Sequence, residues 1–247
     1  MAGMDILEVT TRPAMAELHA EERAGSQGLL RLMAWLSPAF PVGGFSYSAG
    51  LESAVVEDQV SDGDGVEAWL GLLLAHGGLR NDAILLAEAY RVHGEGQSIM
   101  ALASLATALA GSAERHAETT RLGEAFVKAA AAWPHPVIDS LAGPVPYGVA
   151  VGAIASAHGV SKVDAIAAFL HAQVSQYVSV AIRLGVIGQT RGLAILAAAE
   201  APILDAAMEV CRLGLDDLGS ATIIADTLSM RHEVQYSRLF QSEPICS

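Results

Sequence analysis

From Leu29 onward, apolar residues recur at helical spacing along almost the whole chain, and the stretch from Ser161 to Leu184 shows it best. Ser161 can cap a first turn, and Asp164 three residues later completes a capping-box pattern. Apolar residues then fall on one face at i, i+3, i+4, i+7 and i+8, namely Ile166, Phe169, Leu170, Val174, Tyr177, Val178 and Ala181. Gly185 follows, and Arg183 is placed where a cation interacts favourably with the helix dipole. The pattern predicts one long amphipathic helix that ends at Leu184.

The same spacing predicts further helices, and no convincing alternating strand interrupts them. They are expected at Leu29–Leu36, Tyr47–Glu57, Gly65–Ala75, Asn81–His93, Ser98–Leu109, Ala113–Ala132, Tyr147–Ala157, Gly192–Ala199, Pro202–Leu213 and Ile223–Val234. Glycine and proline cluster between them, most densely in Pro134–Pro146, which is interpreted as an internal loop. The expected fold is therefore all-α, a single compact domain of about ten helices.

The two ends of the chain differ from this body. Residues 1–26 are acidic and interrupted by Pro13, so they are expected to be a flexible segment or a single loosely docked helix. The all-helical domain is expected over residues 27–235, and residues 236–247 are expected to be a C-terminal tail that binds a partner. The start of the chain lacks the basic and apolar regions of a signal peptide, which predicts a cytoplasmic protein.

Charge and hydropathy exclude some classes of function. The chain carries 14 Lys and Arg against 27 Asp and Glu, a net charge of −13, so its field has the wrong sign for nucleic acid or anionic lipid. Apolar residues make up 52%, which raises a membrane protein as a rival interpretation. The longest uncharged stretches, Ser140–Ser161 and Ala165–Ile182, contain proline, histidine or glutamine, so they are expected to be core helices instead.

The catalytic and metal-binding motifs that this sequence comes near to are incomplete. Neither lysine lies in a phosphate-binding loop, and Ser46 lacks the second glycine of a nucleophile elbow. The pair His232-Glu233 begins like a zinc-protease helix, but Tyr236 stands where the second histidine is needed. Cys211 and Cys246 form neither a disulfide framework nor a zinc knuckle. No catalytic residue, resident metal site or cofactor is therefore predicted.

Aromatic residues concentrate in two places. Trp35, Phe40, Phe45 and Tyr47 lie within residues 35–47, beside two prolines and a glycine pair. This segment is either a rigid corner of the core or a recognition loop, because aromatic anchors on a constrained turn are common at protein interfaces. The second concentration, Met230–Phe240, is dense in Arg, Tyr, Leu and Phe for a segment near a C-terminus. It is expected either to bury against its own domain or to meet a partner.

Three segments resemble a known family. Ser37–Glu52, Arg183–Thr190 and Met230–Ser242 are similar, in order and spacing, to three signatures of the urease accessory protein UreF family. The resemblance spans about Leu29 to Ser242. It implies an all-α homodimer that is not an enzyme and that assists maturation of the nickel enzyme urease. It also implies binding to the accessory protein UreD (also called UreH), recruitment of the nickel-carrying GTPase UreG, docking on apo-urease, and coupling of GTP hydrolysis to nickel insertion.

The resemblance also implies roles for particular residues. Phe45, Tyr47 and Glu52 would shape the first signature and contribute to a functional face. Arg183, Gln189 and Thr190 would present polar groups beside the dimer or GTPase-facing surface. The tail that orders on the UreD-type partner would comprise Arg231, His232, Glu233, Tyr236, Arg238 and Phe240.

Residue types alone leave a second hypothesis open. An acid, a cation and a titratable imidazole are present in Glu52, Arg183 and His232, so an all-α enzyme with a polar site around them is the alternative.

Overall fold

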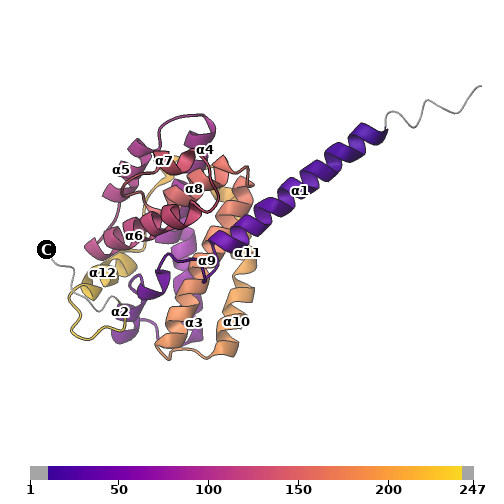
Figure 1. Ribbon diagram of the computed structural model, residues 1–247. Coiled ribbons are helices and arrows are strands. Elements are labelled where there is room, and N and C mark those ends of the chain that lie inside the picture. The colour runs from indigo at the N-terminus through magenta and orange to yellow at the C-terminus, as the bar shows by residue number, and fades with distance from the viewer. Residues whose placement is uncertain (1–10, 241–247) are drawn as a thin grey trace, which may run out of the picture.

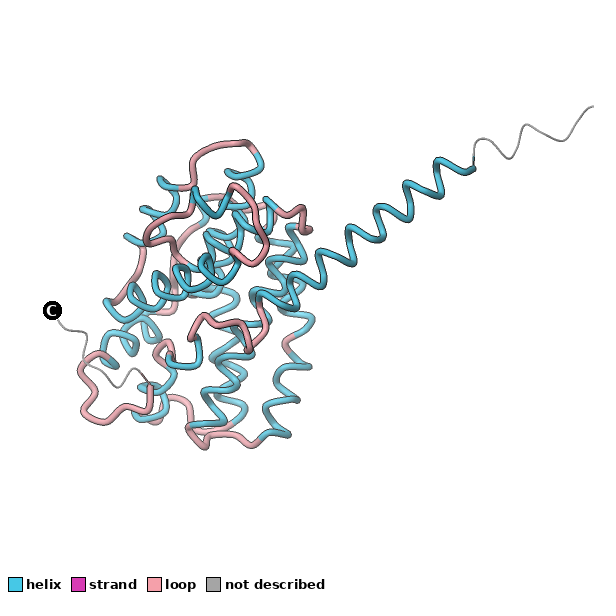
Figure 2. Tube along the Cα trace, in the orientation of Figure 1, coloured by secondary structure: helices cyan, strands magenta, loops and turns pink. Residues whose placement is uncertain are grey.

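Helices and short connecting loops make up the computed structural model, which describes residues 11–240 (Figures 1 and 2). No strand occurs within that range, which confirms the all-α prediction. The α-helices are α1 Thr11–Trp35, α2 Leu51–Val56, α3 Gly63–His76, α4 Gly78–Gly94, α5 Met100–Ala108, α6 Ala113–Ala130, α7 Val137–Ser140, α8 Tyr147–Ala157, α9 Lys162–Arg183, α10 Gln189–Ala198, α11 Glu200–Val210 and α12 Ile223–His232. Short 3₁₀ turns lie at η1 Gly44–Ser46 and η2 Leu215–Asp217.

The Ser161 cap and the Gly185 stop that predicted the ends of α9 are both present in the structure. The Ser161 side chain accepts a hydrogen bond from the backbone N–H of Asp164, which caps the first turn. Gly185 follows the helix with a φ of 76°, a left-handed conformation that glycine adopts without strain. Helix α8 has the bounds predicted for it, Tyr147–Ala157.

The first signature folds differently from its predicted helix. The sequence predicts a helix over Tyr47–Glu57, but α2 begins only at Leu51. Ala49 and Gly50 adopt left-handed φ angles of 47° and 85°, which a continuous right-handed helix cannot include. The residue before α2 is Gly50, and no side chain caps that helix.

The N-terminal helix extends far beyond the predicted Leu29 start. Residues 11–26, expected to be flexible or to form a loosely docked helix, belong to α1, which projects from the body in Figure 1. Among the α1 residues whose burial is described, those that are buried lie at its C-terminal end, namely Gly28, Leu32 and Trp35. Residues 1–10, the start of the predicted acidic segment, lie outside the described range.

Helix α8 lies at the centre of the core and packs closely against α4. Nine of its residues are buried, from Tyr147 to Ala155. A side chain on Gly148 would place its Cβ 2.9 Å from the carbonyl oxygen of Asp82, and one on Gly152 would lie 2.2 Å from that of Leu86. The two backbones therefore touch where these glycines stand.

Helix α9 alone, among the described residues, is long and apolar enough to cross a membrane. It packs against α8, α10, α11 and α4, with Phe169, Leu170 and Val174 buried between them. These contacts are those of a core helix, which passes the same test of length and composition.

Candidate functional site

Three segments that are distant in the sequence meet around one buried histidine. His232, at the end of α12, has an exposed fraction of 0%. Its Nδ1 lies 2.6 Å from Oε2 of Glu114 in the first turn of α6. Its Nε2 lies 2.8 Å from Oε2 of Glu52 in the first turn of α2. The imidazole thus joins α2, α6 and α12.

The two carboxylates decide the charge of the ring. Burial by itself lowers the pKa of His232, but the hydrogen bonds to Glu114 and Glu52, together with their negative charges, outweigh burial and raise it. In the imidazolium form, each ring N–H donates to one carboxylate. The cluster is then a buried cation held between two anions.

Glu52 also fixes the C-terminal segment. Its Oε1 accepts the backbone N–H of Leu239 at 2.6 Å, and its Oε2 accepts that of Phe240 at 3.1 Å. Nearby, the Ser53 hydroxyl donates to Oε1 of Gln235 at 2.9 Å. A single carboxylate therefore binds the end of α12 and the chain that follows it.

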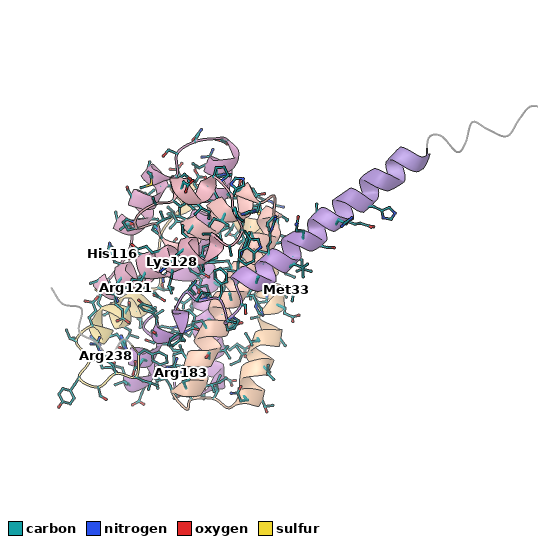
Figure 3. All side chains as sticks on the ribbon, viewed as in Figure 1. Met33, His116, Arg121, Lys128, Arg183 and Arg238 are labelled. Atoms are coloured by element: carbon teal, nitrogen blue, oxygen red, sulfur yellow. The ribbon has the colours of Figure 1, made fainter. Side chains whose placement is uncertain are left out.

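Arg183, the first residue of the second signature, contacts both of the other two signatures. Its guanidinium donates to the carbonyl oxygen of Phe45 at 2.5 Å and lies 4.2 Å from the centre of the Phe240 ring. Gln176, two turns earlier on α9, donates to the carbonyl oxygen of Gly44 at 2.7 Å. In Figure 3, Arg183 and Arg238 lie at the same end of the molecule, beside the C-terminal segment.

Exposed apolar side chains rim this cluster, and together they are called the aromatic rim here. Phe45 is 68% exposed although Arg183 holds its carbonyl oxygen, and Tyr236 and Leu239 are also exposed. Large apolar groups in water on a constrained backbone are typical of protein-binding surfaces. The aromatic rim is defined as Phe45, Val234, Tyr236 and Leu239.

The remaining predicted residues differ in their placement. Tyr47 and Phe240 are buried, so they shape the surface from beneath. Glu233 accepts the backbone N–H of Glu114, and Arg238 donates to the carbonyl oxygen of His232 at 3.5 Å.

Three more predicted residues lie on the surface. Arg231 forms an exposed ion pair with Glu57 at 2.6 Å. Gln189 and Thr190 are exposed at the start of α10, and within residues 11–240 no side-chain hydrogen bond joins them to the cluster. The structure therefore brings ten of the twelve predicted residues together around α2 and α12, and places Gln189 and Thr190 away from them.

A second group of charged side chains, distinct from the His232 cluster, is centred on Arg115. Arg115 pairs with Asp82 and with Glu118, the latter at 2.8 Å. These side chains line a cavity of about 180 Å³ that also reaches Ser48 and Tyr177. Burial raises the pKa of Glu118, and Arg115 opposes that rise. One guanidinium thus faces two carboxylates in this group.

Sequence reasoning missed Glu114 and Arg115. An acidic residue in the first turn of a helix is ordinary, so Glu114 gave no signal of a buried role. Only the tertiary fold brings it to His232, which is more than a hundred positions away in the sequence. In the part of the chain that the structure describes, no three His, Cys, Asp or Glu side chains are placed to hold a metal ion.

The site is thus a set of buried polar residues that tie chain segments together beneath an exposed aromatic rim, in an all-α fold. A family model described as UreF matches residues 60–200. Curated relatives named "Urease accessory protein UreF" are similar over most of their length. The chain belongs to the UreF family, as its three signatures predicted.

Three relatives show the extent of the similarity. The protein of Agrobacterium fabrum is 57% identical over 219 residues, which cover 89% of this chain and 98% of the relative. That of Rhizobium leguminosarum bv. viciae is 55% identical over 216 residues, covering 87% and 97%. That of Sinorhizobium medicae is 50% identical over 221 residues, covering 90% and 99%.

Proposed function

We propose that this chain is a urease maturation chaperone that works by binding. In this proposal it bridges a UreD/UreH-type partner and the nickel-carrying GTPase UreG, and couples GTP hydrolysis to nickel insertion into apo-urease. Nickel is the cargo of the assembly, not a resident cofactor of this chain. Family membership supports the role in urease maturation, and the three signatures support the partners.

One observation carries the binding role. The Glu52 carboxylate holds both His232 and the backbone of Leu239 and Phe240, so the α2, α12 and C-terminal segments form one surface. That surface leaves Phe45 and Tyr236 exposed, with their backbones already ordered. Because the backbone is ordered in advance, binding loses less conformational entropy.

The same geometry argues against the enzyme alternative. A general acid or base must reach the proton that it transfers. Both ring nitrogens of His232 are bonded to carboxylates, and the ring is inaccessible to solvent. Arg183 contacts Phe45 and Phe240, not a shared substrate position with Glu52. These residues support the fold of a surface better than a reaction.

The proposal also includes a cytoplasmic homodimer. Apolar side chains exposed near the base of α1, namely Leu29, Leu30 and Met33, support an association of copies because isolated chains seldom expose such groups together.

Reconstitution tests the proposal. Apo-urease is mixed with UreD, UreG, nickel, bicarbonate and GTP, with and without this chain, and urease activity is measured. We expect activation to depend on the chain, and equal activation without it would refute the proposed function.

Variants of the aromatic rim locate the binding surface. Phe45→Ala and Tyr236→Ala remove exposed rings, so we expect capture of UreD or UreG to fall at least tenfold without loss of folding, the range typical of an interface hot spot. Leu204→Ala, at an exposed position on α11, is the matched control. Equal capture by all three variants and the unaltered chain would show that the rim is not the surface.

A further inference from the structure

Three histidines gather where the end of α1 meets the body. His93 lies in the last turn of α4, His135 in the loop after α6, and His158 directly after α8. The ring centroids of His93 and His135 are 6.2 Å apart, and those of His135 and His158 are 5.2 Å apart. The indole of Trp35, the last residue of α1, lies 5.4 Å from the His158 ring. The rings of His93, His135 and His158 are called the histidine cluster.

The attachment of α1 depends on this region. Arg31 donates a hydrogen bond to the backbone carbonyl oxygen of His158 at 2.9 Å. Leu32 and Trp35 are buried, and Gly28 faces Val160. Residues 22–27, toward the free end, are all exposed. The last two turns of α1 therefore carry its contact with the body (Figure 1).

The hydrogen bonds of the cluster suit neutral rings. Nε2 of His158 is buried without a hydrogen-bond partner in the described structure, so a protonated ring would leave a buried N–H unsatisfied. Nδ1 of His135 accepts the backbone N–H of Val137 at 3.2 Å, and a proton on Nδ1 would set two donors against each other. Nδ1 of His93 pairs with the Ser156 hydroxyl at 3.0 Å, which suits either form.

The charges around the rings favour the same neutral state. Burial, then Arg31, then His135 lower the pKa of His158, and a backbone hydrogen bond with Trp133 opposes them. Burial and His135 lower the pKa of His93. Among the described residues, no carboxylate raises the pKa of either ring. The indole of Trp35 lies close enough to favour a cation, but the pKa of His158 is still lowered overall.

We propose that the histidine cluster is a proton-operated clasp for α1, in which neutral His93 and His158 hold the helix end and protonation of these two rings releases it. The chain with α1 docked binds fewer protons than the chain with α1 released. Docking therefore weakens as the pH falls through the range in which histidine titrates. The clasp sits apart from the His232 cluster and does not depend on the proposed role in urease maturation.

Hydrogen exchange of the backbone amides tests the clasp. Exchange of residues 28–35 is measured in the full chain at about pH 7.5 and about pH 5.5, and is corrected for the intrinsic pH dependence. We expect corrected exchange to rise several-fold in acid, because burial and Arg31 lower the pKa of His158 while α1 is docked, so protonation favours the released helix. Light scattering at both pH values verifies an unchanged oligomeric state.

Variants separate the clasp from general acid sensitivity. His158→Gln cannot be charged, so it should lose most of the acid response, and His158→Arg should release α1 already at neutral pH. His171→Gln, at an exposed position on α9, is the matched control and should keep the full response. Where the His158→Gln protein does not fold, His93→Gln replaces it and should reduce the response. Unchanged exchange in the unaltered chain, or a full response in the folded glutamine variant, would overturn the proposal.

Discussion

At the scale of single residues, Glu52 performs several tasks with one carboxylate. It binds His232 and receives two backbone N–H groups from the C-terminal segment. The sequence predicted that Glu52 and His232 contribute to function, because both lie in recognisable signatures. It could not predict their contact, because 180 positions separate them and spacing carries no information at that range.

Glu52→Gln keeps the shape of this side chain and removes its charge. We expect the free energy of unfolding to fall by about 2–3 kcal/mol, since hydrogen bonds to a buried charge are strong and His232 loses one of its two anions. Urea unfolding followed by circular dichroism measures the change. Glu57→Gln, in the exposed pair with Arg231, is the control and should change stability by no more than about 1 kcal/mol. Equal losses in both variants would contradict the special role of Glu52.

The raised pKa of His232 gives a pH dependence with a definite sign. Its contribution to stability is complete below the unfolded value of 6.5 and is lost as the pH rises through the higher folded value. Unfolding measured at increasing pH should therefore show declining stability of the unaltered chain relative to His232→Gln. A constant difference between the two proteins across that range would show that His232 does not titrate differently on folding.

At the scale of the elements, periodicity and capping predicted α8 and α9 well, because those helices satisfy their own local rules. The same reasoning misplaced the start of α2. Ala49 and Gly50 turn into left-handed conformations there, and the backbone of α12 passes close to Gly50, with a Cβ at that position only 3.2 Å from the amide nitrogen of Ser229. A tertiary contact thus decided a local boundary.

The glycines of α8 provide a test of the α4–α8 contact. Gly152→Ala would set a Cβ 2.2 Å from the Leu86 carbonyl oxygen, so we expect a loss of about 1–3 kcal/mol or more. Gly71→Ala, on an exposed face of α3 with nothing within 4 Å, should raise stability by about 0.5–1 kcal/mol. Thermal unfolding of both variants checks that the first loses stability and the second gains it. Stabilisation by Gly152→Ala would show that the two backbones are not in contact.

At the scale of the whole molecule, the two histidine groups respond to protons in opposite directions. His232 contributes stability that is lost as the pH rises, whereas His93 and His158 contribute stability that is lost as the pH falls. The first group holds the C-terminal segment and the second holds α1. The overall shape was only partly predictable, because the segment before Leu29 was expected to be either flexible or one loosely docked helix, and neither expectation showed that α1 would extend out from the body.

Limited proteolysis tests the exposure of α1. Arg23 is exposed on its projecting part, and Arg12 precedes a proline, where trypsin does not cut. We expect the first cleavage after Arg23, because local unfolding there breaks no contact with the body. Mass spectrometry of the earliest fragments identifies the site. Arg91, held by Glu88 and Glu95 within α4, is the internal comparison, and cleavage there first would contradict this arrangement.

The close contact of α4 with α8 has a consequence during synthesis on the ribosome. About 50 residues separate the end of α4 from the start of α8, which corresponds to roughly 3–10 s of translation. During that time the apolar face of α4 that later packs against α8 remains uncovered. The nascent chain therefore passes through an aggregation-prone intermediate with exposed apolar surface, and slower translation would lengthen the lifetime of that intermediate.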